Sequence, residues 1–386
     1  MHPNLLRAAL SQRSPSLALR LAGRPAFASS PALISQRYLS INNGAPSLQS
    51  SRIGDQPGVE GLHQHDSKAV TTPDSSKQAH ELLPASSVLR GDWVLFHPVY
   101  TPEELKAVEV MFREAKTFPD KIAAGFVKSL RLGFDFVSRY KHKEIPPKSS
   151  MTLQQLREAG YAMDPTQWLA RIIFLETTAA VPGMVAATLR HLRSLRLMKR
   201  DSGWIHTLLE EAENERMHLM TFMTLREPPV WLRALCLAAQ GVFYNLFFFS
   251  YIISPRTCHR FVGHLEEEAV LTYTKCIKDI EEGRLPEWSE HPAPEIAKDY
   301  WRLNHDATML DVIYAVRSDE STHRFVNHSL ANLKYESDVN PFAFGEPDMH
   351  TKGTKLGFER NEADAYVEHT RKLFEDSERG AKSDRH

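Results

Sequence analysis

The stretch LEEAENERMHLM, residues 209–220, places Glu215 three positions before His218. Residues three apart lie on the same face of an α-helix, so both side chains are presented to one neighbour. The stretch RSDESTH, residues 317–323, repeats the spacing with Glu320 and His323. A helical bundle that binds two metal ions takes one such pair from each of two helices and one glutamate from each of two others. Two more buried glutamates are therefore required.

Glu176 and Glu266 supply these carboxylates, and they alternate along the chain with the two pairs. Glu176 lies in the apolar stretch IIFLETTAAVPGMV, where an unpaired carboxylate is costly. An ion pair with Arg171 or Arg190 is the simpler interpretation, but a metal site accounts for all four segments together. Carboxylates with a minority of imidazoles favour iron or manganese over zinc. Four carboxylates and two neutral imidazoles also balance the charge of two divalent ions, which favours burial.

The apolar periodicity predicts a long helix for each ligand segment and two more. The six expected helices span 119–142, 166–197, 201–225, 229–252, 256–283 and 306–334. The predicted fold is all-α, a ferritin-like di-iron four-helix bundle with two additional membrane-facing helices. The chain should divide into a transit peptide and flexible region (1–60), an N-terminal arm (61–115), the bundle with its membrane-associated helices (116–336) and a polar C-terminal tail (337–386). Within the tail, a short helix is expected near 360–376.

The first 54 residues contain no Asp, Glu or Lys but several Arg and many Ser and Ala. This composition is typical of an organelle transit peptide. Three cysteines in 386 residues indicate a reducing compartment and no disulfide framework. The formal net charge of -1 gives no indication of nucleic-acid binding, and nucleic acid is not expected among the partners.

Three polar residues lie beside the expected ligands. Asn214 and Asp319 each precede a ligand glutamate, and each is suited to hydrogen-bond a metal-binding histidine on a neighbouring helix. Tyr273 follows Glu266 by two helical turns on the same face, where it could donate an electron or a proton. A solvated polar residue, or a tyrosine that only packs, is the alternative for each.

The segment 234–255 has no charged residue and is long enough to cross a membrane. Ligand residues precede and follow it, however, so a crossing would separate them. We therefore expect this helix to lie on a membrane surface. The basic amphipathic pattern of Lys121, Ile122, Phe126 and Lys128 suits an anionic interface, although a core-facing helix would show the same pattern. Apolar surface on the helices at 166–197 and 201–225 suggests a homodimer.

Four stretches resemble the signature sequences of the alternative oxidases, the cyanide-insensitive ubiquinol oxidases of mitochondria. They are LETTAAVPGMV (175–185), LEEAENERMHLM (209–220), LEEEAVLTY (265–273) and RSDESTH (317–323). The resemblance extends roughly from Gly91 to Phe344, and GDWVLFHPVYTPEEL (91–105) is similar to the fungal-type members. Ser318 departs from the alanine that the family usually has there. No cysteine precedes Cys236, so the 2-oxo-acid control of plant members is not expected.

The resemblance implies a non-haem centre of two iron ions, a redox-active Tyr273, and Trp301 near the centre. The implied iron ligands are Glu176, Glu215, His218, Glu266, Glu320 and His323. The implied quinol pocket comprises Arg131, Asp135, Arg171, Leu175, Leu265, Glu268, Ala269 and Thr272.

The expected activity is oxidation of ubiquinol and reduction of dioxygen to water without proton pumping. The expected location is the matrix face of the inner mitochondrial membrane, with the protein bound to lipid as a peripheral or monotopic homodimer. The alternative is another ferritin-like di-iron protein: a plastid-type quinol oxidase, a hydroxylase or an iron-storage protein. Membrane fractionation separates the storage alternative from the oxidase, because storage requires no membrane face.

Overall fold

The computed structural model describes residues 97–137, 145 and 151–383. They belong to one compact unit, Gln56–His386. These ranges are built from helices and loops, and no β-strand occurs within them. The predicted transit peptide and flexible region, residues 1–60, lies outside the described residues.

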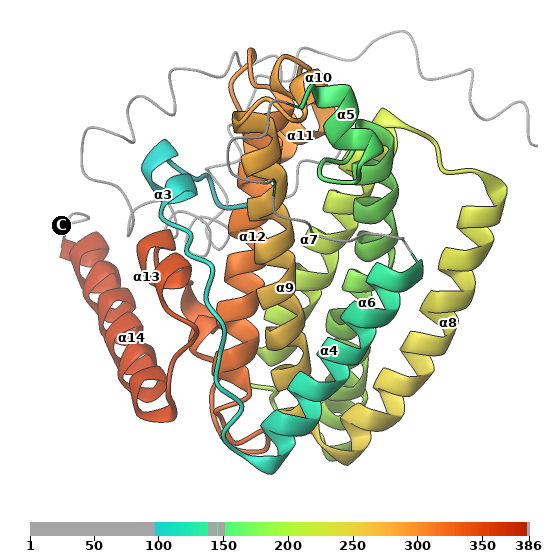
Figure 1. The fold of residues 1–386 in the computed structure, drawn as a ribbon. Helices are drawn as coiled ribbons and strands as arrows, with labels where there is room; N and C mark the ends of the chain where they lie inside the picture. The colour runs from blue at the N-terminus through green and yellow to red at the C-terminus, as the bar shows by residue number, and fades with distance from the viewer. Residues whose placement is uncertain (1–96, 138–144, 146–150, 384–386) are drawn as a thin grey trace, which may run out of the picture. The chain divides into compact units, whose positions relative to one another are not determined.

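Long helices occupy most of the described chain (Figure 1). They are α4 (Phe118–Val137), α6 (Pro165–Leu197), α7 (Trp204–Leu225), α8 (Val230–Ile253), α9 (Pro255–Glu281), α12 (Met309–Leu330) and α14 (Arg360–Ser383). Shorter elements connect them: α3 (Pro102–Lys106), α5 (Leu153–Glu158), α10 (Pro286–Ser289), α11 (Glu295–Trp301), η2 (Pro341–Phe344) and α13 (Met349–Thr354). The all-α prediction is confirmed, and the six predicted helices start and end close to their expected positions wherever the structure describes them.

Local sequence signals fix the helix that carries Glu176. The Asp164 carboxylate accepts the backbone N–H of Gln167, and the Gln167 side chain accepts the N–H of Asp164. This reciprocal cap satisfies two backbone donors that a helix start leaves free. Pro165 follows at the first helical position, where its missing N–H costs nothing. Met198 ends α6 in the left-handed conformation, with φ 49°.

The four ligand-bearing helices form the bundle. Helix α6 packs along α7, and α9 packs along α12; α4 lies against α9, and α8 lies against α6 (Figure 1). Two large apolar clusters lie in the core of the described residues, the first around Trp168, Phe222 and Trp301 and the second around Trp204 and Phe325. A third, smaller cluster contains Val108, Val270 and Met349. Along each of the four bundle helices, the predicted ligands fall where residues of one cluster give way to residues of the other, with His218 just inside the first cluster, between Met217 and Phe222. The ligands therefore form a polar layer sealed by apolar packing above and below.

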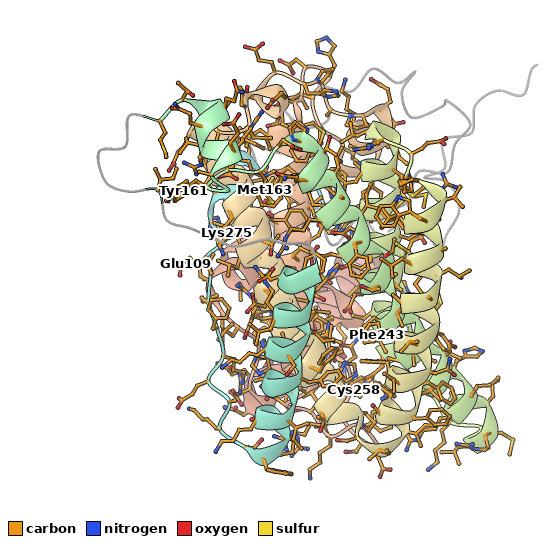
Figure 2. The ribbon with its side chains drawn as sticks, turned by 45° about the vertical axis from the view of Figure 1, so that its right-hand side comes forward. Glu109, Tyr161, Met163, Phe243, Cys258 and Lys275 are labelled. Atoms are coloured by element: carbon orange, nitrogen blue, oxygen red, sulfur yellow. The ribbon has the colours of Figure 1, made fainter. Side chains whose placement is uncertain are left out.

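Helix α8 leaves most of its apolar side chains exposed, as do parts of α4 (Figure 2). The exposed residues include Phe118, Ile122, Phe126, Leu130 and Leu132 on α4, and Val230, Trp231, Leu237, Val242, Leu246, Phe249, Ile252 and Ile253 on α8. By length and composition α6 and α8 could each cross a membrane. Helix α6 is a bundle helix, and just over half of its most apolar stretch is buried. In α8, only 17% of the corresponding stretch is buried. An apolar face of this size marks a surface for lipid or for another protein.

The C-terminal residues pack on the bundle, and so the expected polar tail is anchored to it over much of this segment. Met349, Phe358 and Ala363 are buried. Phe358 stacks against Phe342 and edge-on against Phe325 of α12. This packing was not predicted because these anchors are single apolar residues spaced along a highly charged stretch. Helix α14 also extends beyond the expected 360–376.

Candidate metal centre

The structure brings all six predicted ligands together. One group joins Glu176, Glu215, His218 and Glu320, and a second joins Glu215, Glu266, Glu320 and His323. Within each group, one ligand atom per residue lies within 4.8 Å of the others, and every member is buried. Glu215 and Glu320 belong to both groups. Two adjacent metal positions that share two carboxylates are the arrangement expected of a dinuclear site.

The donor atoms of this cluster fit a pair of cations. Glu176 Oε2, both carboxylate oxygens of Glu215, and Nδ1 of His218 and of His323 are buried without a hydrogen-bond partner. All five atoms are lone-pair donors in an apolar bundle. Buried lone pairs that face one another cost free energy unless a cation or a proton lies between them. Oxygen donors with a minority of nitrogen donors suit iron or manganese.

The two imidazoles present the same nitrogen to the carboxylates. Nδ1 of His218 lies 3.4 Å from Glu176 and from Glu215 and 3.5 Å from Glu320. Its Nε2 lies 2.9 Å from Oδ2 of Asp319. A carboxylate that accepts one N–H leaves the other nitrogen unprotonated for a metal. Nδ1 of His323 lies 2.7 Å from Glu215 Oε1, a short contact whose angle is not that of a hydrogen bond.

Two carboxylates of the cluster, those of Glu176 and Glu266, have raised pKa values. Burial and the charge of Glu215 raise the pKa of Glu176 to about 8. Burial, together with the charges of Glu320 and Glu215, raises the pKa of Glu266 well above its usual value. Burial also opposes ionisation of Glu215, but the His323 and His218 imidazoles lower its pKa. Mutual repulsion of this kind is what two divalent cations relieve.

Asp319 accepts hydrogen bonds from several side chains around His218. Its Oδ2 accepts from Trp301 Nε1 at 2.8 Å and from Asn214 Nδ2 at 2.9 Å, in addition to His218. Burial opposes ionisation of Asp319, but His97 and His218 hold its pKa well below the usual range. Asp319 thus contacts a ligand histidine as its position suggested. Asn214 bonds to Asp319 and to the hydroxyl of Tyr300 instead of a ligand histidine.

Tyr273 lies at the edge of the ligand layer. Its hydroxyl donates a hydrogen bond to Oε1 of Glu176, from α9 to α6. Burial raises the pKa of Tyr273 well above the usual value, and the Glu176 carboxylate raises it further. A neutral phenol beside a ligand carboxylate can hold or release a proton there. The spacing of Tyr273 from Glu266 therefore predicted that it lies near the expected ligands, but its hydroxyl contacts Glu176 and not Glu266.

The polar residues of the expected quinol pocket also lie together, between α4, α6 and α9. Arg131 Nε lies 3.0 Å from Asp135, and its Nη1 lies 2.9 Å from Glu268 and 3.3 Å from Thr272 Oγ1. Arg171 Nη2 lies 2.8 Å from the other oxygen of Asp135. These contacts join the three helices. Leu175, Leu265 and Ala269 are half-buried on the same helices.

Several residues near the centre were missed in the sequence. His97 and Tyr100 reach Asp319 from the N-terminal segment, and Tyr300 bonds to Asn214. Glu211 lies one turn before Glu215, and burial raises its pKa to about 7. The four-residue spacing from Glu215 was the available signal for Glu211. No local signal connects His97 or Tyr100 with Asp319, more than 200 positions away.

A second buried cluster contains His264, Glu267 and His328. Its carboxylate already accepts hydrogen bonds from both imidazoles and from the backbone N–H of Arg113. The guanidinium of Arg260 lies 2.8 Å from Nδ1 of His328. A carboxylate saturated by N–H donors, beside a fixed cation, has little to offer a metal ion. This cluster is a structural ion-pair network.

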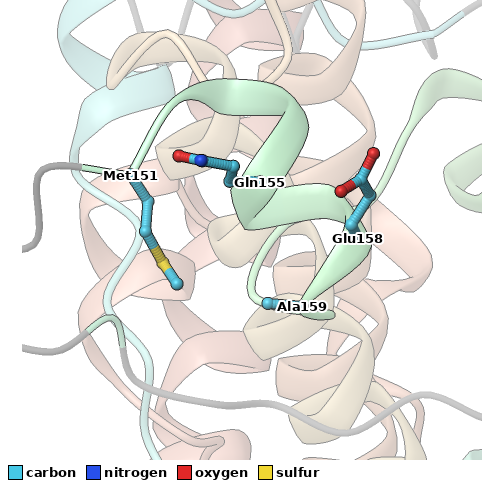
Figure 3. Close-up of a pocket in the computed structure, with 4 residues that line it drawn as sticks. All are labelled: Met151, Gln155, Glu158 and Ala159. Carbon is cyan, nitrogen blue, oxygen red and sulfur yellow. The ribbon is translucent and has the colours of Figure 1, made fainter.

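Two of the hollows in the described part of the chain lie at α5 and between α6 and α8. One, of about 470 Å³, lies beside α5 and is lined by Met151, Gln155, Glu158 and Ala159 (Figure 3). A smaller one, of about 180 Å³, lies between α6 and α8 and is lined in part by Thr177, Cys236 and Gln240. Neither is lined by any predicted site residue.

Comparison with known proteins agrees with the site. Residues 100–332 match the alternative oxidase family. The mitochondrial alternative oxidase of Cryptococcus neoformans var. grubii is 52% identical over 329 residues, which cover 84% of this chain and 79% of that protein. The mitochondrial alternative oxidase of Emericella nidulans is 54% identical over 277 residues, covering 69% and 75%. That of Aspergillus niger is 50% identical over 289 residues, covering 74% and 80%. The family match covers more than half of the chain, and these relatives share about half of its residues, so the chain belongs to the alternative oxidase family.

Proposed function

We propose that this oxidoreductase oxidises two molecules of ubiquinol and reduces one dioxygen to two waters. The observation that carries the proposal is the pair of four-residue ligand groups that share Glu215 and Glu320. Two quinols release four electrons and four protons, which is the amount that one dioxygen needs to form two waters. A bound pair of iron ions would supply the redox chemistry that links the two half-reactions. The ligands would be Glu176 with His218, Glu266 with His323, and the two shared glutamates.

The ion-pair cluster of Arg131, Asp135, Arg171 and Glu268 is proposed to bind the quinol head group. Arginine side chains can donate hydrogen bonds to quinol oxygens, and a carboxylate can accept a quinol proton. Glu268 is partly exposed, with 26% of its side chain accessible, so a proton taken from quinol can pass on to solvent. Arg171 adds a positive charge above the Phe134 ring, 4.3 Å from its centre. Leu175, Leu265, Ala269 and Thr272 are proposed to complete the pocket.

The substrate explains the apolar face of α4 and α8. Ubiquinol carries a long isoprenoid tail and partitions into lipid, so its pocket must open toward a membrane. We propose that α4 and α8 lie in one leaflet, with the bundle on the matrix face of the inner mitochondrial membrane. The relatives named as mitochondrial, and the acid-poor, arginine-containing residues 1–54, support this location. Such a protein lies on the bilayer without crossing it, and it moves no protons across it.

Oxygen uptake with a soluble quinol analogue, in the presence of cyanide, tests the activity. Iron should be counted per chain in the same preparation. The proposal expects cyanide-resistant uptake by the wild-type chain and loss of both uptake and iron in Glu266→Ala. Glu210→Ala, at an exposed glutamate of α7, is the matched control and should keep both. Iron without turnover in the wild-type chain would indicate a storage protein, and turnover retained in Glu266→Ala would refute the ligand assignment.

A further inference from the structure

The N-terminal segment from His97 to Thr117 runs as an extended strap along α9, α12 and α13, interrupted only by α3 (Figure 1). Charged side chains of the bundle hold its backbone. Arg317 Nη2 donates to the carbonyl of Leu105 at 2.6 Å, and Arg324 Nη1 donates to that of Glu109 at 2.8 Å. The strap is thus bound in part through its main chain. Side chains add to this at Arg113, which pairs with Glu359, and at the first described residues.

His97 and Tyr100 both contact one oxygen of Asp319. His97 Nε2 lies 3.0 Å from Oδ1, and the Tyr100 hydroxyl donates to the same Oδ1 at 2.6 Å. The other oxygen, Oδ2, faces the bundle and accepts from His218 and Trp301. One oxygen of the Asp319 carboxylate therefore contacts the strap, and the other contacts His218.

The His97 ring is fixed on several sides. Only 7% of its side chain is exposed. Its centre lies 4.5 Å from that of Tyr300 and 6.2 Å from that of Trp301. Nδ1 lies 2.8 Å from the carbonyl oxygen of Pro98, which sets the rotation of the ring. An imidazole held in this way keeps Nε2 aimed at Asp319.

We propose that His97 is a positioning residue for the candidate metal centre. It orients the carboxylate of Asp319, and Asp319 in turn fixes the rotation of the His218 imidazole, so that Nδ1 faces the three glutamates. The inference rests on the proposed function, because the rotation of His218 matters only if that ring binds a metal. It follows that the strap from His97 onward contributes a positioning residue to the centre. The mature chain must therefore retain it.

Partners of ligating histidines affect metal affinity by about 10- to 100-fold. His97→Phe keeps a ring beside Tyr300 and Trp301 but removes the contact with Asp319. His97→Gln restores one N–H donor. Val99→Ala, at an exposed position two residues along the strap, is the matched control. All four proteins are purified as full chains loaded with iron.

Two readouts separate positioning from packing: the rate of iron loss to a chelator, and the Mössbauer spectrum of the bound iron. We expect His97→Phe to lose iron about tenfold faster than wild type, with an altered quadrupole splitting. His97→Gln should be intermediate, and Val99→Ala unchanged. Equal loss rates and spectra for wild type, His97→Phe and His97→Gln would overturn the inference but leave the proposed function intact. A wild-type chain that binds no iron would overturn both.

Discussion

The hydroxyl of Tyr273 on α9 donates a hydrogen bond to a carboxylate oxygen of Glu176 on α6, and this contact joins two bundle helices at the candidate metal centre. Tyr273→Phe removes the hydroxyl with little change in volume. We expect the variant to keep its iron, because four glutamates and two histidines remain, but to turn over quinol at least about tenfold more slowly, as expected when a group that transfers protons is lost.

The measurement is the rate of oxygen uptake per bound iron. Tyr314→Phe is the control, because the Tyr314 hydroxyl donates to Glu281, which belongs to neither ligand group. Wild-type turnover in Tyr273→Phe would show that the phenol is only a packing group.

Arg131 contacts Asp135, Glu268 and Thr272, and so it connects the parts of the proposed quinol pocket. Arg131→Met should raise the KM for quinol about tenfold, the cost of one lost charged hydrogen bond, and leave the iron content unchanged. Arg157→Met removes a comparable ion pair with Glu287 far from the pocket and should leave KM unchanged. Loss of iron in Arg131→Met, with KM unchanged, would place the arginine in the metal centre instead.

Val230 and Ile253 stand at the two ends of α8, each with 83% of its surface exposed. If α8 lies in lipid, Val230→Asp together with Ile253→Asp should release the protein from vesicles, because charges resist burial in hydrocarbon. The measurement is the fraction that sediments with vesicles after an alkaline wash. Leu373→Asp, at an exposed leucine of α14, should remain bound. Equal retention of all three proteins would contradict a membrane role for α8.

The ligand set could be predicted from the sequence because each part of it is local. Glu215 and His218 share a helix face by spacing alone, and the apolar residues around Glu176 mark that carboxylate as one that requires a partner. Helix ends were also predictable, since Pro165, Pro255 and the capping side chain of Asp164 act within one turn. These signals need no knowledge of the tertiary fold.

The network around the ligands could be predicted only in part, because its contacts join distant segments. Asp319 was found beside Glu320, but its partners His97 and Tyr100 come from the N-terminal segment. Tyr300, from a short helix, bonds to Asn214. Asn214 was assigned to a histidine and bonds to Asp319 instead. The C-terminal segment was expected to be a tail because its charge hides single apolar anchors such as Phe358. Such anchors can be recognised only from the surface that receives them.

Burial lowers the pKa of His328 to about 4 in the folded protein, below the usual 6.5. The unfolded chain therefore binds more protons between pH 6.5 and 4, and the free energy of unfolding should fall as pH falls through this window. One such group contributes up to about 1.4 kcal/mol per pH unit. The free energy of unfolding can be measured in urea at several pH values. For His328→Gln it should change less with pH than for wild type.

His206→Gln is the control for that titration, because His206 lies on the surface of α7 with 55% of its side chain exposed. It should reproduce the wild-type slope. Identical slopes for His328→Gln and wild type would show that His328 is not buried in the neutral form.

The central claim is that six side chains hold two metal ions, and metal analysis of the purified chain tests it most directly. The account predicts two iron or manganese ions per wild-type chain and fewer than one in Glu215→Ala, because Glu215 belongs to both ligand groups. A wild-type chain with no bound iron or manganese, or a Glu215→Ala chain that keeps both ions, would contradict it.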